Sequence, residues 1–170
     1  SVSLLAGCGG GPAAPDQGAQ PGTQEPAGNP AGSRETVYPL TITDDSGRQV
    51  TIPAEPRRVV SVAPSNTEIV FAIGKGDVLV GRSEFDEYPP EVLEIDSVGG
   101  YSPPNYELIL SKEPDLVLVI GGSGEATNKL INEYGLTAVV IDSESFSDVY
   151  DAIRLIGQIL NAQERPSRSP

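Results

Sequence analysis

Four short apolar runs, separated by amphipathic segments, constrain the fold of this 170-residue chain more than any other feature. The runs cover residues 59–62, 78–80, 116–120 and 138–141, and none alternates strictly between apolar and polar residues. Such runs are typical of strands covered on both faces, and helices between them would supply the crossovers of a parallel sheet. We therefore predict an α/β fold with a parallel sheet of about four strands flanked by helices.

A β-hairpin is predicted ahead of the first run. Residues 38–43 and 48–52 alternate between apolar and polar side chains, and they flank the turn-forming sequence Asp44-Asp45-Ser46-Gly47. Prolines at 53 and 56 then end the second strand. The chain order is thus a hairpin followed by four strand–helix pairs, which is a Rossmann-like arrangement.

Helix-end signals place a helix after each apolar run. The first helix is predicted to begin with the capping-box sequence of residues 65–68, with serine at the N-cap and glutamate three positions later. The second begins after Asn105, and the third covers residues 125–134. The fourth begins near Ser145 or Ser147 and continues with apolar residues at helical spacing.

The charge and composition of the chain disfavour several classes of function. With 24 acidic and 11 basic residues, the formal charge is -13, which argues against nucleic acid as a partner and against acidic lipid surfaces. The chain has no histidine and one cysteine, so it cannot form an internal disulfide and lacks the commonest transition-metal ligand and general base. Metal-assisted hydrolysis and serine–histidine catalysis are therefore not expected.

The single cysteine, Cys8, follows Leu5-Ala6-Gly7 and precedes a Gly- and Pro-rich segment. This sequence resembles a bacterial lipobox, which implies that residues 1–8 are the remnant of a lipoprotein signal peptide and that Cys8 is acylated. The rest of that signal peptide would lie upstream of Ser1. Residues 9–36 contain few large apolar groups and are predicted to be a disordered tether. The resemblance implies an exported protein, anchored by lipid to the outer face of the cytoplasmic membrane or periplasmic.

A family resemblance becomes specific at residues 61–68, Ser-Val-Ala-Pro-Ser-Asn-Thr-Glu. Together with four further fragments, the chain resembles the N-terminal lobe of the iron-siderophore and vitamin B12 substrate-binding proteins of ABC importers. These fragments are Ala-Ile-Gly at 72–74, Tyr-Pro-Pro at 88–90, Val-Gly-Gly at 98–100 and Glu-Pro-Asp-Leu-Val at 113–117. The resemblance implies an N-terminal lobe over 37–144, part of an interlobe helix over 145–163, and a tail outside the family over 164–170.

The resemblance also implies a function without catalysis. Family members capture a ferric siderophore, haem or cobalamin as transported cargo rather than as a cofactor, and they deliver it to a membrane permease driven by an ATPase. Glu68 matches the glutamate that docks on the permease, although its position also suits the predicted capping box. The second lobe, with the other half of the pocket, does not follow in this sequence, so the chain is expected to be either a fragment of a longer gene product or the result of a truncation or frameshift.

Ligand contacts are expected at the C-terminal ends of the strands, where open α/β sheets bind their ligands. The resemblance implies three such loops, residues 63–66, 82–88 and 99–105. The residues that it assigns to the ligand are Ser65, Asn66, Arg82, Phe85 and Tyr101. The aromatic rings would lie flat against a macrocycle or chelate, and the arginine would bind a carboxylate or an anionic ferric chelate. Phe85 could equally anchor its loop, and the arginine could equally be a solubilising surface charge.

Three alternatives remain open from the sequence. Gly-Gly-Ser-Gly at 121–124 follows an apolar run, and Asp142 lies about 20 residues further on, as in an NAD-binding fingerprint, but Thr127 replaces the third glycine. Direct capture of a bare cation would use carboxylates in one loop, although such acids usually form a solvated surface. Those carboxylates are Glu84, Asp86, Glu87 and Glu91. The third alternative is a surface lipoprotein without a transport role.

Overall fold

The computed structural model describes residues 11, 35–100 and 102–162 of the chain. Cys8 and Tyr101 lie outside these residues, as do the predicted tether, apart from residues 11, 35 and 36, and the predicted C-terminal tail. The strands are β1 (Leu40–Thr43), β2 (Gln49–Ile52), β3 (Val59–Ser61), β4 (Leu79–Gly81), β5 (Leu116–Ile120) and β6 (Ala138–Ile141). The helices are α1 (Pro64–Ala72), α2 (Tyr106–Ser111), α3 (Gly124–Asn132) and α4 (Phe146–Ile159), with 3-10 turns at Gly76–Val78 and Pro90–Glu94.

The four apolar runs form one parallel sheet, as predicted, in the order β4-β3-β5-β6. Because β3 leads outward through α1 to β4, whereas β5 lies on its other side, the order reverses between β3 and β5. The carboxyl ends of the strands at such a reversal are where open α/β sheets hold ligands. The sheet therefore places the candidate site at the edge where β3, β4 and β5 end.

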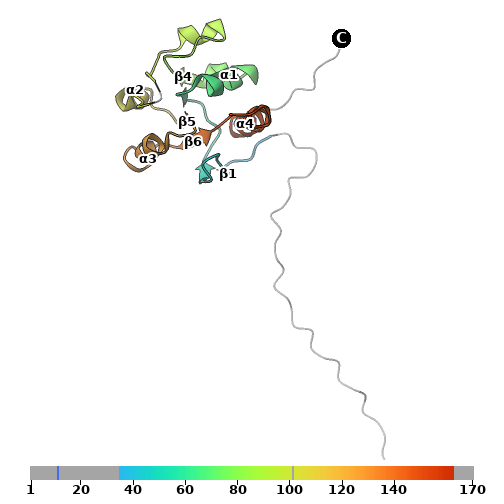
Figure 1. Cartoon of the computed structure of the whole chain (residues 1–170). Helices are drawn as coiled ribbons and strands as arrows, with labels where there is room; N and C mark the ends of the chain where they lie inside the picture. Colours follow the sequence, from blue (N-terminus) through green and yellow to red (C-terminus); the bar gives the residue numbers. More distant parts are fainter. Residues whose placement is uncertain (1–10, 12–34, 101, 163–170) are drawn as a thin grey trace, which may run out of the picture. The chain divides into compact units, whose positions relative to one another are not determined.

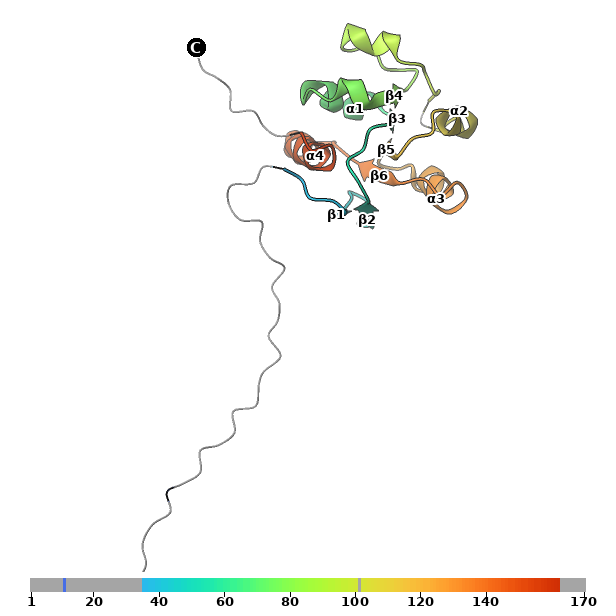
Figure 2. The ribbon, with the colours of Figure 1, turned by 180° about the vertical axis from the view of Figure 1, so that it is seen from behind.

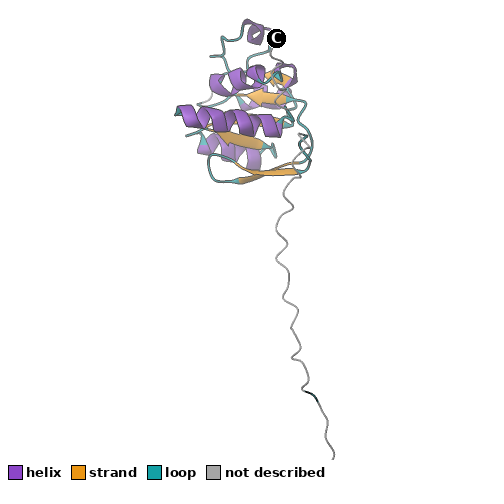
Figure 3. Ribbon diagram, turned by 90° about the vertical axis from the view of Figure 1, so that its right-hand side faces the viewer, coloured by secondary structure: helices purple, strands orange, loops and turns teal. Residues whose placement is uncertain are grey.

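Helices cover both faces of this sheet (Figures 1 and 2). On one face, Leu116 and Leu118 pack with α1 and α4, and on the other Val117 and Val119 pack with α2 and α3. Successive side chains of a strand point to opposite faces, so a strand buried on both sides must be apolar throughout. This explains the unbroken runs. Figure 3 shows the helices lying along the strands in a layered α/β arrangement.

The predicted hairpin is confirmed, with β1 and β2 antiparallel and Leu40 opposite Ile52. Its turn caps the free edge of β6. The Asp44 Oδ2 atom accepts a hydrogen bond from the Val140 amide at 3.1 Å, and the Asp45 amide donates to the Val140 carbonyl at 3.1 Å. Unpaired backbone groups of an edge strand need such partners, and here the turn supplies them.

The predicted start of the first helix is wrong. Helix α1 begins at Pro64 with Ala63 as its N-cap, so Ser65 and Glu68 lie inside the helix and make no capping box. Proline fits the first helical position because its missing amide would lack a helical partner there and its fixed φ suits the helix. Glu68 is exposed and is not needed as a cap.

The predicted starts of α2 and α4 are confirmed, and α3 begins at Gly124, one residue before its predicted start. The Asn105 side chain accepts a hydrogen bond from the Leu108 amide at the start of α2. Ser145 is the N-cap of α4 and forms a capping box with Asp148. None of the helices in the described segments is long and apolar enough to cross a bilayer.

Candidate functional site

The structure brings two of the three predicted ligand loops together by backbone hydrogen bonds. The Glu84 amide donates to the Gly99 carbonyl at 3.0 Å, and the Val98 amide donates to the Arg82 carbonyl at 2.8 Å. The chain after β4 therefore pairs with the segment before residues 99–105. The third loop, residues 63–66, follows β3, the neighbour of β4 in the sheet. The described residues of all three loops thus lie at the carboxyl edge of the sheet.

Phe85 is an exposed aromatic side chain at this edge, with 56% of its surface accessible. Its ring lies close to Gly100, where an added Cβ would stand 3.2 Å from the Phe85 Cε2 atom and 2.9 Å from the Glu84 Oε1 atom. A side chain at position 100 would therefore push the ring or the neighbouring carboxylate aside. Phe85 thus presents an exposed aromatic surface at the carboxyl edge of the sheet.

Arg82 is half-buried and is held by its own loop. Its Nε atom donates to the Ile95 carbonyl at 2.9 Å, and its Nη1 atom donates to the Ser83 carbonyl at 2.8 Å. Through these two hydrogen bonds the guanidinium group holds the backbone of the loop in place. The structure thus gives Arg82 a structural role that the sequence analysis did not consider.

Ser65 and Asn66 lie in the first turn of α1. Ser65 is half-buried, whereas the Asn66 side chain is fully buried and its Nδ2 atom donates to the Val119 carbonyl at 3.2 Å. Asn66 thereby ties α1 to β5 at the point where β3 and β5 diverge. Its Oδ1 atom has no hydrogen-bond partner among the described residues.

Asp86 is a residue of this edge that the sequence analysis misjudged. It was grouped there with three surface acids, yet only 1% of its surface is accessible, whereas Glu84, Glu87 and Glu91 are exposed. Its Oδ2 atom accepts hydrogen bonds from the Thr67 hydroxyl at 2.7 Å and from the Ser83 amide at 3.1 Å. Because this loop contains several acidic residues, the local sequence does not show which carboxylate points inward to a helix.

The environment of Asp86 raises the pKa of its carboxyl above the ordinary aspartate value. Burial raises the pKa of the Asp86 carboxyl, and the negative charge of Glu68 raises it further. Hydrogen bonds from Thr67 and Ser83 and the charge of Arg82 lower the pKa, but they do not outweigh burial. Perturbed carboxyls of this kind cluster at functional sites, although structural networks produce them too.

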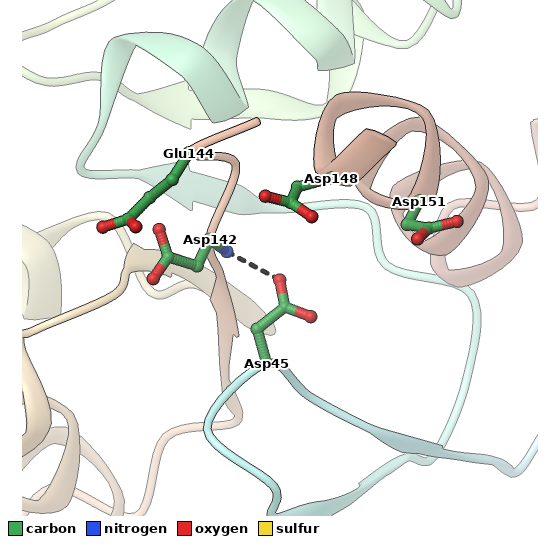
Figure 4. A pocket seen from close by; sticks show the side chains of 5 residues that line it. All are labelled: Asp45, Asp142, Glu144, Asp148 and Asp151. Carbon is green, nitrogen blue, oxygen red and sulfur yellow. Dashed lines mark hydrogen bonds between the residues drawn. The ribbon is translucent and has the colours of Figure 1, made fainter. Parts of the chain in front are cut away.

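A group of carboxylates lines a hollow of about 250 Å³ elsewhere on the carboxyl edge, near β6 (Figure 4). The Asp45 carboxylate accepts a hydrogen bond from the Asp142 amide at 2.6 Å, and Asp148 is used in the cap of α4. The residues that line the hollow are Asp45, Asp142, Glu144, Asp148 and Asp151. In the described part of the chain, no group of carboxylate, cysteine or histidine residues has the geometry of a metal site.

The glycines of the NAD-like fingerprint have a structural explanation. An added Cβ at Gly121 would lie 2.1 Å from the Asp142 Oδ2 atom, so Asp142 packs directly on the backbone of Gly121. Gly122 adopts a φ of +78°, which residues with a side chain rarely adopt. These glycines let the chain turn after β5 and let Asp142 approach.

A comparison with protein families matches residues 59–167 to the family described as periplasmic binding protein. YvrC of Bacillus subtilis strain 168, named as an uncharacterized ABC transporter substrate-binding lipoprotein, is 40% identical over 149 residues, 81% of this chain and 47% of that protein. The vitamin B12-binding protein of Vibrio cholerae strain O395 is 35% identical over 106 residues, 61% of this chain and 37% of that protein.

Solved structures give the same result. The periplasmic solute binding protein of Veillonella parvula aligns with a TM-score of 0.65 and 27% identity over 72% of this chain and 41% of that one. The periplasmic vitamin B12 binding protein BtuF of Vibrio cholerae aligns with a TM-score of 0.57 and 31% identity over 67% and 44%. The chain spans less than half the length of each of these relatives. All four relatives are named as binding proteins, which favours ligand binding over the NAD-enzyme alternative. From its sequence and its fold, this chain belongs to the periplasmic binding protein family.

Proposed function

We propose that this chain is the N-terminal ligand-binding lobe of an ABC importer's substrate-binding component, and that it captures a ferric siderophore, haem or cobalamin without chemical change. The observation that carries the proposal is the exposed Phe85 ring, seated against Gly100 at the carboxyl edge of the parallel sheet. A large planar ligand can stack on such a ring with little loss of side-chain entropy. Tyr101, next to Gly100 in the sequence, is proposed as a second aromatic contact.

Delivery to a permease is proposed to use Glu68. Its carboxylate is exposed on α1, a helix that begins at the ligand edge, and it has no capping duty there. An exposed charge suits orientation and encounter with a partner. The ATPase that drives import would act through this permease and would not contact the lobe itself.

Membrane attachment is proposed to use acyl chains on Cys8. The relative from Bacillus subtilis is named a lipoprotein, and Cys8 ends a lipobox-like sequence in this chain. When the chain is produced behind a complete lipoprotein signal peptide in a bacterium that makes lipoproteins, the Cys8→Ser variant is expected to lose palmitate incorporation and to leave the membrane fraction, because the given sequence holds no second thiol. Metabolic labelling and fractionation measure both effects, and equal labelling of variant and parent would contradict the anchor.

Equilibrium dialysis of the chain against cyanocobalamin, haemin and ferric hydroxamate and catecholate siderophores tests the proposed capture. One of these probes is expected to bind saturably, with one ligand per chain, while NAD does not bind. A single lobe covers only part of a ligand, so the affinity will be modest. Failure of every probe to bind below about 1 mM would contradict capture by this lobe.

A further inference from the structure

We propose that Asp86 is a positioning residue, which fixes the Phe85 loop, residues 82–88, to helix α1 through its hydrogen bond with Thr67. The inference deepens the proposed function and rests on it, since the position of Phe85 matters for capture only if its ring meets the ligand. No ligand contact is assigned to Asp86, because its side chain is buried.

The contacts of Asp86 join two segments that are 19 residues apart in the sequence. Its Oδ2 atom accepts from the Thr67 hydroxyl of α1 at 2.7 Å and from the Ser83 amide of its own loop at 3.1 Å. Asp86 is 1% exposed, and Ser83 and Thr67 are fully buried. One carboxylate oxygen thus ties the beginning of the loop to the helix in a site without exposed atoms.

The same network reaches the backbone of Phe85. The Ser83 hydroxyl accepts a hydrogen bond from the Phe85 amide at 3.1 Å, and the Ser83 amide is held by Asp86. The Phe85 side chain extends from this backbone, so the hydrogen bond between its amide and Ser83 helps to set the position of the ring. A ligand platform gains affinity when it is held in the bound orientation beforehand.

The hydrogen bond between Asp86 and Thr67, which we call the clamp, persists in both protonation states of Asp86. The Thr67 hydroxyl lies 2.7 Å from Asp86 Oδ2, 2.8 Å from the Ser61 hydroxyl oxygen and 3.2 Å from the Ala63 carbonyl, but it has one proton. It donates to Asp86 when the carboxyl is ionised. When the carboxyl is protonated, Asp86 donates to Thr67, and Thr67 donates to Ser61 or Ala63.

Thr127 provides a matched control for Thr67. Each threonine is the fourth residue of its helix, and each is buried, at 2% and 0% exposure for Thr127 and Thr67. Each hydroxyl also bonds the carbonyl of its own N-cap residue, Ser123 at 2.9 Å or Ala63 at 3.2 Å. Within the described residues the Thr127 hydroxyl contacts only Ser123, so its removal tests the loss of a buried hydroxyl without a clamp.

Amide hydrogen exchange in the ligand-free 170-residue chain tests the clamp directly. Thr67→Val and Asp86→Ala are expected to accelerate exchange at residues 83–88 about tenfold relative to the amides of β5. Thr67→Ser keeps the hydroxyl, and Asp86→Asn keeps an acceptor oxygen. The exchange rates of residues 83–88 in these two variants should therefore stay near those of the parent. Thr127→Val should not accelerate this loop. Unchanged rates in Thr67→Val, or acceleration shared equally with β5, would overturn the proposal.

The pH dependence of the Ser83 amide resonance gives a second readout that loss of packing alone would not move. The resonance should follow the titration of Asp86, with a midpoint above the ordinary aspartate pKa. Thr67→Val should raise that midpoint because it removes a hydrogen bond that lowers the pKa, and Glu68→Gln should lower it. In Asp86→Asn the Ser83 amide resonance should show no such midpoint. An equal midpoint in Thr67→Val and in the parent would contradict the hydrogen bond between Thr67 and Asp86.

Dialysis of the same variants separates this inference from the proposed function. If one probe binds the parent chain, Thr67→Val should weaken its binding about tenfold, and Thr67→Ser should restore it. Altered loop exchange with unchanged affinity would show that the clamp does not serve capture. If no probe binds the parent or any variant, the proposed function is wrong, and Asp86 has no role in ligand capture. The exchange data still decide whether Asp86 fixes the loop to α1.

Discussion

Replacement of Asp44 by alanine is expected to lower the free energy of unfolding by about 2–3 kcal/mol, because hydrogen bonds to a charged group contribute about 1.5–3 kcal/mol. Asp44 is 3% exposed and accepts from the amides of Val140, Ser46 and Arg48 and from the guanidinium of Arg48 at 2.7 Å. Alanine would leave the amide of Val140 without this partner at the edge of β6. The decrease in the free energy of unfolding includes the cost of leaving this buried amide without a partner, as well as the loss of the hydrogen bonds themselves.

Chemical denaturation measures this effect, with Asp45→Ala as the matched control from the same turn. Asp45 is exposed, and its carboxylate accepts a hydrogen bond from the Asp142 amide. Removal of this side chain should therefore lower the free energy of unfolding by only about 0.5–1.5 kcal/mol. Equal losses in the two variants would contradict the view that the Asp44 carboxylate anchors the hairpin to the sheet.

The contribution of Asp44 should also depend on pH. Burial raises the pKa of its carboxyl, but hydrogen bonds from Ser46, Arg48 and Val140 outweigh burial and leave the pKa below its ordinary value. A carboxyl with a lowered folded-state pKa stabilises the fold above its unfolded-state pKa, and this contribution is lost as the pH falls through the folded-state value. The stability difference between the parent and Asp44→Asn should therefore be largest near neutral pH and shrink below about pH 4.

Replacement of Phe85 by alanine is expected to weaken binding of the captured probe about thirtyfold, which corresponds to an aromatic interface residue worth about 2 kcal/mol. The ring is 56% exposed in the free chain, so its removal should change the free energy of unfolding little. The affinity is measured by the dialysis described above and the stability by denaturation.

Phe146→Ala is the matched control for Phe85→Ala. Phe146 is 90% exposed at the start of α4, and it belongs to none of the three candidate ligand loops. Its removal should leave the affinity within about twofold of the parent, as expected for a surface change away from the site. Equal weakening by both variants, or no weakening by Phe85→Ala, would contradict the assignment of Phe85 to the ligand.

Local patterns in the sequence were sufficient to predict most of the fold. The strands of the parallel sheet appear as apolar runs because both faces are buried, and the hairpin appears as alternation around a turn. The starts of α2 and α4 follow from Asn105 and Ser145, whose side chains cap the next turn. At α1, two local signals compete, and proline at the first helical position prevails over the serine that follows it.

The sequence did not predict the roles that depend on distant partners. The sequence analysis grouped Asp86 with acids that usually form a solvated surface and placed Asp44 in a turn. In the structure Asp86 bonds to Thr67, and Asp44 bonds to Val140 at a separation of 96 residues. No periodicity within a loop can indicate a bond to another element. The assignment of Phe85 came from a family resemblance, and the structure adds its exposure and its contact with Gly100.

Amide chemical-shift mapping of the 17.8 kDa chain, titrated with the probe that binds in dialysis, tests the central claim most directly. The account predicts that the shifts concentrate in residues 63–66, 82–88 and 99–105, at the carboxyl edge of β3 and β4. Shifts centred instead on the acidic hollow that contains Asp142 and Asp148 would contradict it. So would shifts confined to the hairpin or spread evenly over the sheet.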